Sequence, residues 1–316
     1  MIRIAVDAMG GDHAPSAIVD GAVAAAAGQS DIQISLVGAT TSIEAELCRH
    51  PNWRELPIDV IAAPDVVPMA ARPADLRRKP GASIRVASNL VACHDAAALF
   101  SAGHTGATVV AAHAALGMIP GVERPAVAAT IPTRNNPVIL LDAGANIECR
   151  PHHLLQFAVM GSAYARLALG LPHPRVGLLS VGEEETKGNE LTREAHRLLK
   201  AASINFAGNV DGREIYSGVA DVIVCDGFTG NIVLKSSEGL VEALEQRLGE
   251  RLSRVFDYSE YGGAPLLGIA GLAVIGHGRS SAKAVSSAIA MAHRFVAGDF
   301  IHRLEKEIAA AAVTQQ

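Results

Sequence analysis

A short segment after an apolar run brings together three glutamates and a lysine in VGEEETKGN, residues 181–189. Lys187, on a turn beside a glycine, can reach an anion as a mobile point charge, and a neighbouring carboxylate such as Glu184 can position it or accept a proton. Asn189 adds a neutral hydrogen-bonding group. The alternative interpretation is a first helical turn, where the glutamates would complement the helix dipole. The combination of lysine, glycine and asparagine favours an anion-binding loop of an active site.

Metal and cofactor chemistry are not predicted by the sequence. Consecutive acidic side chains point in different directions from a strand or a helix, and the segment lacks the alternating spacing of a carboxylate metal loop. The four cysteines are widely separated and form no CxxC pair, which favours reduced thiols in a cytoplasm over disulfides or a zinc site. No GxGxxG dinucleotide fingerprint is present. We therefore expect no metal and no cofactor.

Two glycine-rich segments follow other apolar runs and precede helical patterns. They are VDAMGGDHAP, residues 6–15, and SAGHTGA, residues 101–107. Glycine lets the backbone approach a ligand, and a helix start offers free N–H groups and a positive dipole end to phosphate. A capped turn is the alternative interpretation of each segment. The residues that we assign here to substrate or phosphate binding are Gly10, Gly11, Asp12, Ser101, His104, Thr105 and Gly106.

Two further segments place an aspartate at a strand end with glycine and asparagine behind it. They are LLDAGANIECRP, residues 140–151, and VCDGFTGNIVLK, residues 224–235. Each aspartate is either a cap on the following turn or a polar group of the site. We expect Cys225 to be a buried strand residue. The binding candidates from these segments and from the preceding ERP motif are Arg124, Asp142, Asn146, Thr229 and Asn231, with Asp226 as a candidate general base.

Apolar, strand-like runs alternate with helical patterns along the chain. The expected strands are residues 2–8, 32–38, 58–63, 96–102, 125–131, 137–144, 175–182, 221–227 and 272–276. The expected helices are residues 14–27, 41–49, 82–94, 106–118, 152–169, 190–202, 228–254 and 280–297. This alternation predicts an α/β fold, with a mainly parallel sheet covered by helices on both faces. Ligands of such sheets bind outside the carboxyl ends of the strands, where the polar segments lie.

Length and composition limit the remaining possibilities. A chain of 316 residues, 49% hydrophobic, can form one catalytic α/β domain over residues 1–316 or two lobes around a cleft. Its net charge of −5 and the lack of a basic, aromatic stripe argue against nucleic acid as a partner. An acidic residue at position 7 argues against a secretory signal. Residues 63–83, with four prolines and a basic cluster, are expected to form a surface loop.

The residues now carry a resemblance. Eight motifs occur in one order along nearly the whole chain: VDAMGGDHAP, SAGHTGA, ERPAVAATIPT, LLDAGAN, VGEEETKGN, GNVDGREI, CDGFTGNIVLK and EYGGAPLLG. In this the sequence resembles bacterial phosphate acyltransferases. The resemblance implies a fold similar to isocitrate and isopropylmalate dehydrogenases, and a homodimer. It also implies transfer of a fatty acyl group from acyl-acyl carrier protein to inorganic phosphate, giving an acyl phosphate that a membrane glycerol-3-phosphate acyltransferase uses in phospholipid synthesis.

The sequence departs from the family pattern at three places. His104 replaces an asparagine in SAGHTGA, and Arg279 replaces a small residue in GHGRSS. In relatives, a longer helical hairpin at this place has an apolar tip that suits contact with the bilayer. The segment of residues 236–257 is shorter here, which puts peripheral membrane association in doubt. We expect the protein to be cytoplasmic. Leucines at every fourth position of this segment are typical of a core or a dimer interface. They are Leu240, Leu244, Leu248 and Leu252.

The expected chemistry is phosphorolysis of a thioester without a covalent enzyme intermediate. We expect Lys187 to bind phosphate or the oxyanion, Asp226 to act as a base, and His277 to protonate the departing thiolate. Competing interpretations are a phosphotransacetylase for short-chain acyl-coenzyme A, a nicotinamide-dependent hydroxyacid dehydrogenase, and a non-catalytic scaffold that recruits acyl carrier protein. The candidate docking residues for that acidic carrier, or simply a solvated basic loop, are Arg72, Arg77, Arg78 and Lys79.

Overall fold

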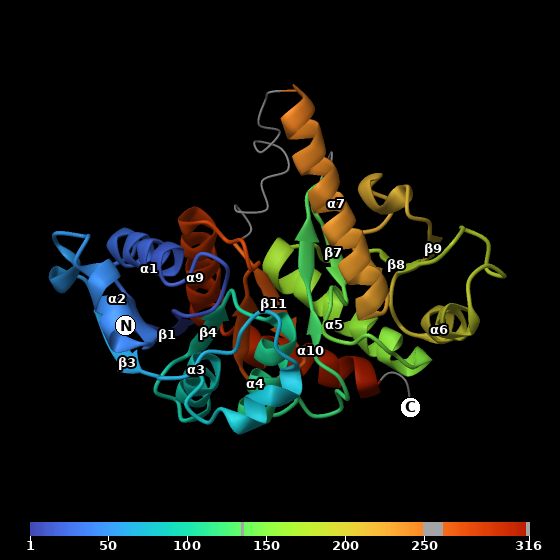
Figure 1. The fold of residues 1–316 in the computed structure, drawn as a ribbon. Helices are drawn as coiled ribbons and strands as arrows, with labels where there is room; N and C mark the ends of the chain where they lie inside the picture. Colours follow the sequence, from blue (N-terminus) through green and yellow to red (C-terminus); the bar gives the residue numbers. More distant parts are fainter. Residues whose placement is uncertain (134–135, 249–261, 314–316) are drawn as a thin grey trace. The chain divides into compact units, whose positions relative to one another are not determined.

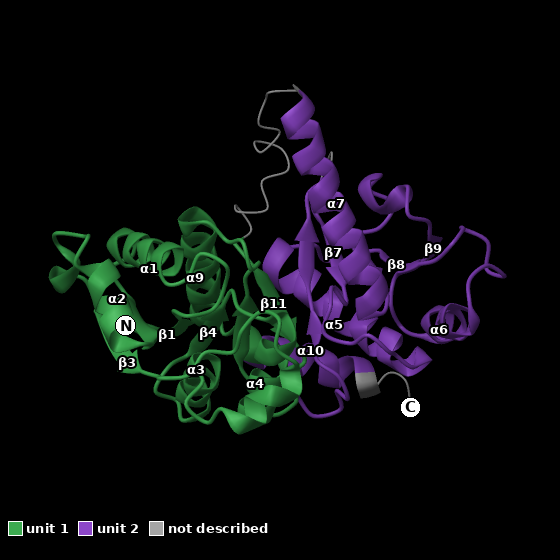
Figure 2. Cartoon of the chain, viewed as in Figure 1, with its two compact units in different colours: residues 1–118, 259–301 green, residues 119–258, 302–316 purple. Residues whose placement is uncertain are grey.

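The structure is a computed structural model that describes residues 1–133, 136–248 and 262–313 (Figure 1). The chain divides into two compact units (Figure 2). Unit 1 contains residues 1–118 and 259–301, and unit 2 contains residues 119–258 and 302–316. Each unit has its own sheet core and its own loops at strand ends, and each is described by itself below.

Unit 1 is built on a mainly parallel sheet. Its strands run in the order β3 (Ile58–Ala62), β2 (Ile32–Gly38), β1 (Ile2–Asp7), β4 (Ala98–Ser101), β12 (Leu272–Ile275) and β11 (Ala264–Leu267). Only the β11–β12 pair is antiparallel among these neighbours. The central strands are apolar along most of their length, with IAV in β1, ALF in β4 and LAVI in β12, because helices cover both faces of the sheet.

In the described part of unit 1, five helices cover the sheet. They are α1 (Ser16–Gly28), α2 (Thr40–Leu47), α3 (Ser83–Ala92), α4 (Thr105–Leu116) and α9 (Ala282–Ala297). Helices α1 and α9 pack against each other on one face, and α3 and α4 on the other (Figure 1). The α1–α9 contact requires Gly21, because a Cβ atom at this position would lie 2.5 Å from Val285 Cβ and 2.6 Å from the Ala282 carbonyl oxygen. The alanine-rich sequence of both helices allows this close approach.

Unit 2 contains a second, five-stranded sheet. Its order is β6 (Ala129–Ile131), β7 (Val138–Leu141), β10 (Val222–Val224), β8 (Val176–Leu179) and β9 (Phe206–Val210), and only β6 is antiparallel to its neighbour. Strand β5 (Ala126–Val127) precedes β6. The helices are α5 (Pro151–Leu169), α6 (Glu190–Ala201), α7 (Gly227–Leu248) and, from residue 302 onward, α10 (Phe300–Val313). Gly161 lets α5 pack on β10, since a Cβ atom there would lie 2.6 Å from Val222 Cγ1.

The expected pattern of strands and helices is confirmed at most positions. Each expected strand is present within its predicted range, and the range 125–131 is divided into β5 and β6. Strands β9 and β11 and helix α10 were not expected. The loop of residues 63–83 contains the 3-10 helix η2 (Pro73–Arg78) and is joined across its base by a bridge between Asp65 and Ala82. Two further 3-10 turns are η1 (Trp53–Glu55) and η3 (Glu214–Tyr216).

Helix α7 corrects the expectation for the leucine stripe. Leu240 is 61% exposed and Leu244 is 39% exposed, so their assignment to the core of the chain is wrong. The alternative assignment to a dimer interface stays a prediction. Leu252 and the rest of the expected helix beyond Leu248 lie outside the described residues, as do residues 249–257 of the segment that was compared with the hairpin of relatives. In the part of the chain that the structure describes, no helix combines the length and apolar character needed to span a membrane.

Candidate functional site

In unit 1, the loops after β1, β4 and β12 meet at one edge of the sheet. Ser101 pairs with both Asp7 and Ile275, so the three strands end together. The loops after β1 and β4 are in backbone contact, because a Cβ atom on Gly10 would lie 2.7 Å from the nitrogen of Gly103. The Asp12 N–H donates to the carbonyl oxygen of Gly278 at 2.7 Å, which joins the loop after β12 to the loop after β1. The structure therefore brings the predicted unit 1 residues together.

Asp7 is a buried carboxylate in this cluster that the sequence analysis did not select. Its side chain accepts hydrogen bonds from the Ser101 hydroxyl at 2.7 Å and from the Met9 N–H at 3.3 Å. Burial raises the pKa of Asp7, and the donated hydrogen bonds oppose this shift. A small pocket beside it is lined by Gly10 and His104 among others. A buried carboxylate offers no fixed positive charge to a phosphate dianion, so this edge suits an uncharged or hydrogen-bond-donating part of a substrate better.

His104 caps helix α4. Its Nδ1 accepts a hydrogen bond from the Ala107 N–H at 3.2 Å, and its carbonyl oxygen accepts one from the Thr108 hydroxyl at 3.3 Å. A neutral His104 therefore carries its proton on Nε2. Thr105 and Gly106 form the first turn of α4. Where the family has asparagine, His104 is also a side chain that can cap the helix. Contact between His104 and a ligand stays a prediction.

His277 lies in a tight turn after β12. Its carbonyl oxygen accepts hydrogen bonds from the Ser280 N–H at 2.9 Å and from the Ser280 hydroxyl at 2.6 Å. Its Nδ1 accepts one from the Arg279 N–H at 3.2 Å. The neutral ring therefore has its proton on Nε2, which is the atom that a donor role would use.

In unit 2, Asp142 is the centre of the loop that follows β7. Its Oδ1 accepts hydrogen bonds from the N–H groups of Val127 at 3.0 Å, Gly144 at 3.1 Å and Ala145 at 3.0 Å. Its Oδ2 accepts two bonds from Asn146, one from the backbone N–H at 2.7 Å and one from Nδ2 at 2.9 Å. The side chain is buried, and both oxygens are occupied. Asp142 therefore organises the loop that a substrate would meet. Burial raises the pKa of Asp142, and the hydrogen bonds from Ala145, Val127 and Asn146 oppose the rise.

The loop after β10 packs on the Asp142 loop. A Cβ atom on Gly227 would lie 2.6 Å from Asp142 Oδ2, and the Gly227 N–H donates to the Asn146 carbonyl oxygen at 2.7 Å. Asn231 lies next to Gly144, whose Cβ position is 3.6 Å from Asn231 Cβ. The predicted residues Asp142, Asn146 and Asn231 are therefore neighbours, as their positions at the ends of adjacent parallel strands required.

Asp226 is a helix cap. Its Oδ1 accepts from the Thr229 N–H at 2.9 Å, and its Oδ2 accepts from the Thr229 hydroxyl at 2.8 Å. The capping interpretation is confirmed, and the role of general base stays a prediction. Cys225 is buried, as expected, and burial raises the pKa of its thiol well above the usual range. Cys149 also has a raised pKa, of about 12, mainly through burial, so neither thiol is prepared to act as a nucleophile.

The glutamate-rich segment forms a loop between β8 and α6. Its three glutamates precede α6 by several residues, and the acidic residue in the first turn is Glu190, so the helix-dipole interpretation is wrong. Asn189 caps α6, with Oδ1 accepting from the Thr192 N–H at 2.9 Å. The Glu184 carbonyl oxygen accepts from Asn209 Nδ2 at 2.9 Å and from the Lys187 N–H at 2.9 Å. These contacts fix the backbone around an exposed lysine.

Lys187 and Arg124 are the two cations of unit 2 that the sequence analysis assigned to phosphate. Both side chains are exposed. Among the described residues, neither the ammonium group of Lys187 nor the guanidinium group of Arg124 has a hydrogen-bond or ion-pair partner. Strand β8, which leads to the Lys187 loop, is the direct neighbour of β10. Both cations are therefore available to an anion in solution.

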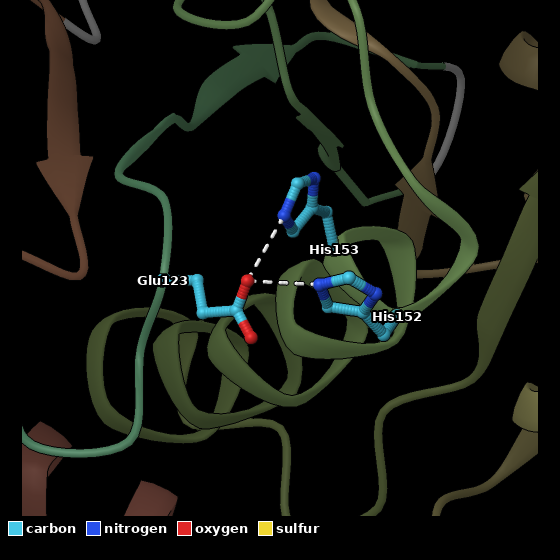
Figure 3. A group of neighbouring side chains, drawn as sticks. All are labelled: Glu123, His152 and His153. Carbon is cyan, nitrogen blue, oxygen red and sulfur yellow. Dashed lines mark hydrogen bonds and ion pairs between the residues drawn. The ribbon is translucent and has the colours of Figure 1, made fainter.

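Three side chains next to Arg124 form a further group that sequence reasoning missed. Glu123, His152 and His153 point toward one another from the segment before β5 and the first turn of α5 (Figure 3). Glu123 Oε2 lies 2.9 Å from His152 Nε2 and 3.3 Å from His153 Nε2. Such a group has the composition of a metal site, although the chain shows no sequence signature for one. Its residues are too far apart along the chain for spacing to reveal it.

His153 makes the stability of unit 2 depend on pH. Burial, followed by the nearby His152, lowers the pKa of His153, whereas Glu123 raises it and Arg124 lowers it. A depressed folded pKa means that the unfolded chain binds the proton more tightly, so stability is present above pH about 6.5 and is lost as pH falls below it. We expect urea unfolding midpoints to fall between pH 7.5 and pH 5.5, and to fall less in His153→Gln. An equal fall in both proteins would contradict this assignment.

The family model and the curated relatives that match this chain point to the same family. A model of the family described as "Fatty acid synthesis protein" matches residues 2–255 and 243–303. The chain is 48% identical over 315 residues to a phosphate acyltransferase of Nitratidesulfovibrio vulgaris (strain DP4), covering 93% of this chain and 91% of the relative. It is 47% identical over 328 residues to a phosphate acyltransferase of Geotalea uraniireducens (strain Rf4), covering 97% and 94%.

Solved structures share the fold. A phosphotransacetylase from Streptococcus pyogenes superimposes with a TM-score of 0.63 at 17% identity, covering 98% of this chain and 94% of that chain. A branched-chain phosphotransacylase from Enterococcus faecalis V583 gives 0.62 at 18% identity, covering 94% and 99%. An isocitrate dehydrogenase from Methylococcus capsulatus gives 0.51 at 13% identity, covering 100% and 91%. The expected dehydrogenase-like α/β fold is confirmed.

Proposed function

Because this chain belongs to the phosphate acyltransferase family, we propose that it transfers a fatty acyl group from acyl-acyl carrier protein to inorganic phosphate. In this reaction a phosphate oxygen attacks the thioester carbonyl carbon, the carbon–sulfur bond breaks, and the carrier leaves as a thiolate. The products are an acyl phosphate and the free carrier thiol. The family match extends over residues of both units, which supports the proposal that residues 1–316 act as one catalytic protein.

The observation that carries the proposal is the pair of cations on the loops of unit 2 that have no hydrogen-bond or ion-pair partner among the described residues. Phosphate at neutral pH is already a nucleophile, so the protein needs to hold it and to stabilise the oxyanion that forms on the thioester carbonyl. We assign phosphate and oxyanion binding to Lys187 and Arg124. The loop that Asp142 and Asn146 organise, and the neighbouring Thr229 and Asn231, would position the reacting groups.

Proton transfer is a smaller requirement. A thiol leaving group with a pKa of about 8.5 departs readily as a thiolate, so a general acid adds little to the rate. His277 remains the proposed proton donor to the thiolate and Asp226 the proposed base. The unit 1 loops, with Gly10, Gly11 and the Ser101–Gly106 turn, would offer backbone N–H groups. Asp7 beside them favours contact with the neutral thioester portion over contact with the phosphate dianion.

The proposal includes partners that belong to the family reaction. An acidic carrier protein would dock on the exposed arginines at η2 in unit 1. Lys79, the fourth cation of this loop, donates instead to the Val66 carbonyl oxygen at 2.6 Å. A membrane glycerol-3-phosphate acyltransferase would consume the product. We also propose that the protein is a homodimer and that it acts in the cytoplasm. The four unpaired cysteines support the cytoplasmic location. The arginines in question are Arg72, Arg77 and Arg78.

The test is thiol release from purified protein supplied with palmitoyl-acyl carrier protein, with and without phosphate, beside palmitoyl-coenzyme A and acetyl-coenzyme A. We expect phosphate-dependent release from the carrier substrate. Release from acetyl-coenzyme A alone would favour the short-chain phosphotransacetylase. A lack of release from every donor would favour the scaffold that recruits acyl carrier protein. Mass spectrometry of the acyl phosphate product separates phosphorolysis from hydrolysis.

A further inference from the structure

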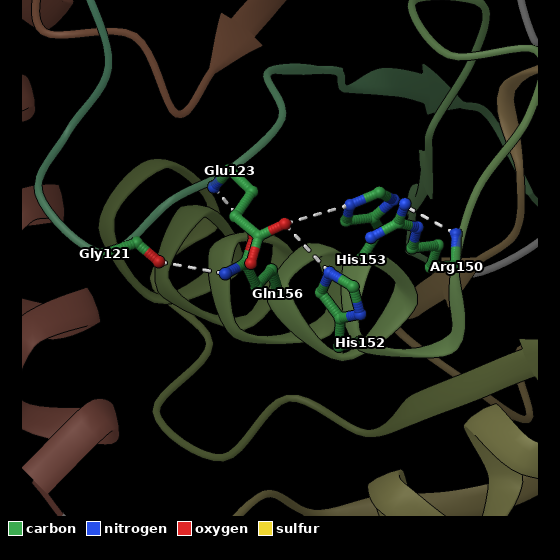
Figure 4. Close-up of polar contacts among 6 residues, drawn as sticks. All are labelled: Gly121, Glu123, Arg150, His152, His153 and Gln156. Atoms are coloured by element: carbon green, nitrogen blue, oxygen red, sulfur yellow. Dashed lines mark hydrogen bonds and ion pairs between the residues drawn. The ribbon is translucent and has the colours of Figure 1, made fainter.

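The backbone on the amino-terminal side of Arg124 is fastened to α5 by three side chains (Figure 4). The Glu123 N–H donates to Gln156 Oε1 at 3.0 Å, and Gln156 Nε2 donates back to the Gly121 carbonyl oxygen at 2.9 Å. The Glu123 carboxylate bonds to the two histidines of the first turn of α5. This irregular segment is thus fixed to α5 by hydrogen bonds of its backbone and of the Glu123 side chain.

The backbone on the other side of Arg124 is also held. The Pro125 carbonyl oxygen accepts a hydrogen bond from Asn146 Nδ2 at 2.7 Å, and the same amide group bonds to Asp142. Arg124 therefore lies between two fixed neighbours while its own guanidinium group has no hydrogen-bond or ion-pair partner among the described residues. This is the arrangement expected of a cation that is positioned in advance for a ligand.

The protonation of His153 decides whether the three side chains hold a metal ion or a hydrogen-bonded carboxylate. The Arg150 N–H donates to His153 Nδ1 at 3.0 Å, so Nδ1 carries no proton (Figure 4). A neutral His153 consequently has its proton on Nε2, the atom that faces Glu123. That proton occupies the lone pair of Nε2 that a metal ion would need. In addition, metal-ligating histidines usually donate a hydrogen bond from the nitrogen that does not bind the metal, whereas Nδ1 of His153 accepts one. The lowered pKa of His153 agrees with a neutral ring.

We propose that Glu123, His152 and His153, which we call the Glu123 clamp, position Arg124 for binding the phosphate substrate. The proposal rests on the proposed function. The two histidines bond to the Glu123 carboxylate, and no ion pair forms between Glu123 and the adjacent Arg124. A carboxylate released from the histidines could instead pair with the guanidinium group and compete with phosphate for it. The clamp thus fixes the backbone and keeps the cation free.

A double-mutant cycle tests the clamp. We expect Glu123→Ala to raise the KM for phosphate about tenfold, because a small displacement of a substrate-binding group is costly, with the KM for the acyl donor unchanged. Glu123→Gln, which keeps an acceptor oxygen for the histidines, should restore most of the affinity. In an Arg124→Ala background, Glu123→Ala should add nothing further, since the clamp acts only through Arg124. Glu194→Ala, which removes a half-exposed, ion-paired glutamate from α6, is the matched control and should leave both KM values unchanged.

The outcomes that overturn the clamp are distinct from those that overturn the function. Independent, multiplying effects of the two substitutions, an unchanged phosphate KM in Glu123→Ala or in Arg124→Ala, or equal changes in both KM values would each refute it. Stoichiometric Zn²⁺ binding that Glu123→Ala abolishes, together with loss of phosphate affinity on chelation, would replace the clamp with a metal site. If the wild-type protein releases no thiol, the proposed function fails, and phosphate binding measured by calorimetry on the same variants decides the clamp.

Discussion

Replacing Lys187 with alanine is expected to lower phosphate-dependent turnover by about 10²–10³-fold, the usual cost of removing one group that stabilises developing negative charge. The lysine is exposed, and its ammonium group has no partner among the described residues, so its removal breaks no contact of the folded state. The thermal midpoint should therefore remain that of the wild-type protein. Initial rates with saturating acyl-acyl carrier protein, measured over a range of phosphate concentrations, give the result.

Two companion variants make this result specific. Lys187→Arg keeps the charge but changes its shape, and should recover part of the rate. Lys306→Ala removes an exposed lysine from α10 of the same unit and should leave the rate unchanged. A full rate in Lys187→Ala would remove this residue from the mechanism and leave Arg124 as the proposed phosphate-binding cation.

Asp142→Asn is expected to reduce the free energy of unfolding by about 3 kcal/mol, although it changes a single atom type. Asp142 accepts five hydrogen bonds, two of them on Oδ2. In asparagine one oxygen becomes an NH₂ group, which places donors against donors in a buried site and leaves them unsatisfied. Loss of the raised carboxylate pKa offsets part of this cost near neutral pH, because a neutral side chain is easier to bury. Urea unfolding at pH 7.5 measures the difference.

Asp95→Asn is the control for this experiment. Asp95 is an exposed residue of a turn in unit 1, and the same chemical change there should alter stability by less than about 0.5 kcal/mol. If Asp142→Asn were as stable as the control, the donors around this side chain would not need a second acceptor oxygen, and the network of five accepted hydrogen bonds would be contradicted.

The sequence predicts the elements whose pattern is local. Buried parallel strands such as β4 and β12 are apolar almost throughout, and each is followed by a helical pattern. Strand β9 has the sequence FAGNV, in which Gly208 and Asn209 are poor strand formers, so only its pairing with β8 makes it a strand. Strand β11 contains Pro265 and depends on its antiparallel neighbour β12. Such elements follow from tertiary context and not from periodicity.

The residues of the candidate site also divide into those that a local sequence pattern predicts and those that only the folded structure reveals. Glycine-rich strand ends and the lysine loop could be selected from the sequence, because parallel strands place their carboxyl ends together. The roles of individual carboxylates could not. Asp7 and Asp142 are each the last or next residue of a strand, yet only the donors around them reveal that they are buried and satisfied. The Glu123 clamp joins residues 29 and 30 positions apart, which no local pattern specifies.

The manner in which Asp142 is held has a consequence for ionic strength. Among the described residues its partners are N–H donors and not a counter-ion, and the group is buried, so dissolved salt does not screen the contacts that shape this loop. Lys187 and Arg124 are exposed, and their attraction for a dissolved anion weakens as salt is added. The geometry of the loop and the binding of an anion by the two cations therefore respond differently to ionic strength. A change in salt concentration adjusts how much phosphate is bound while the geometry that receives it stays the same.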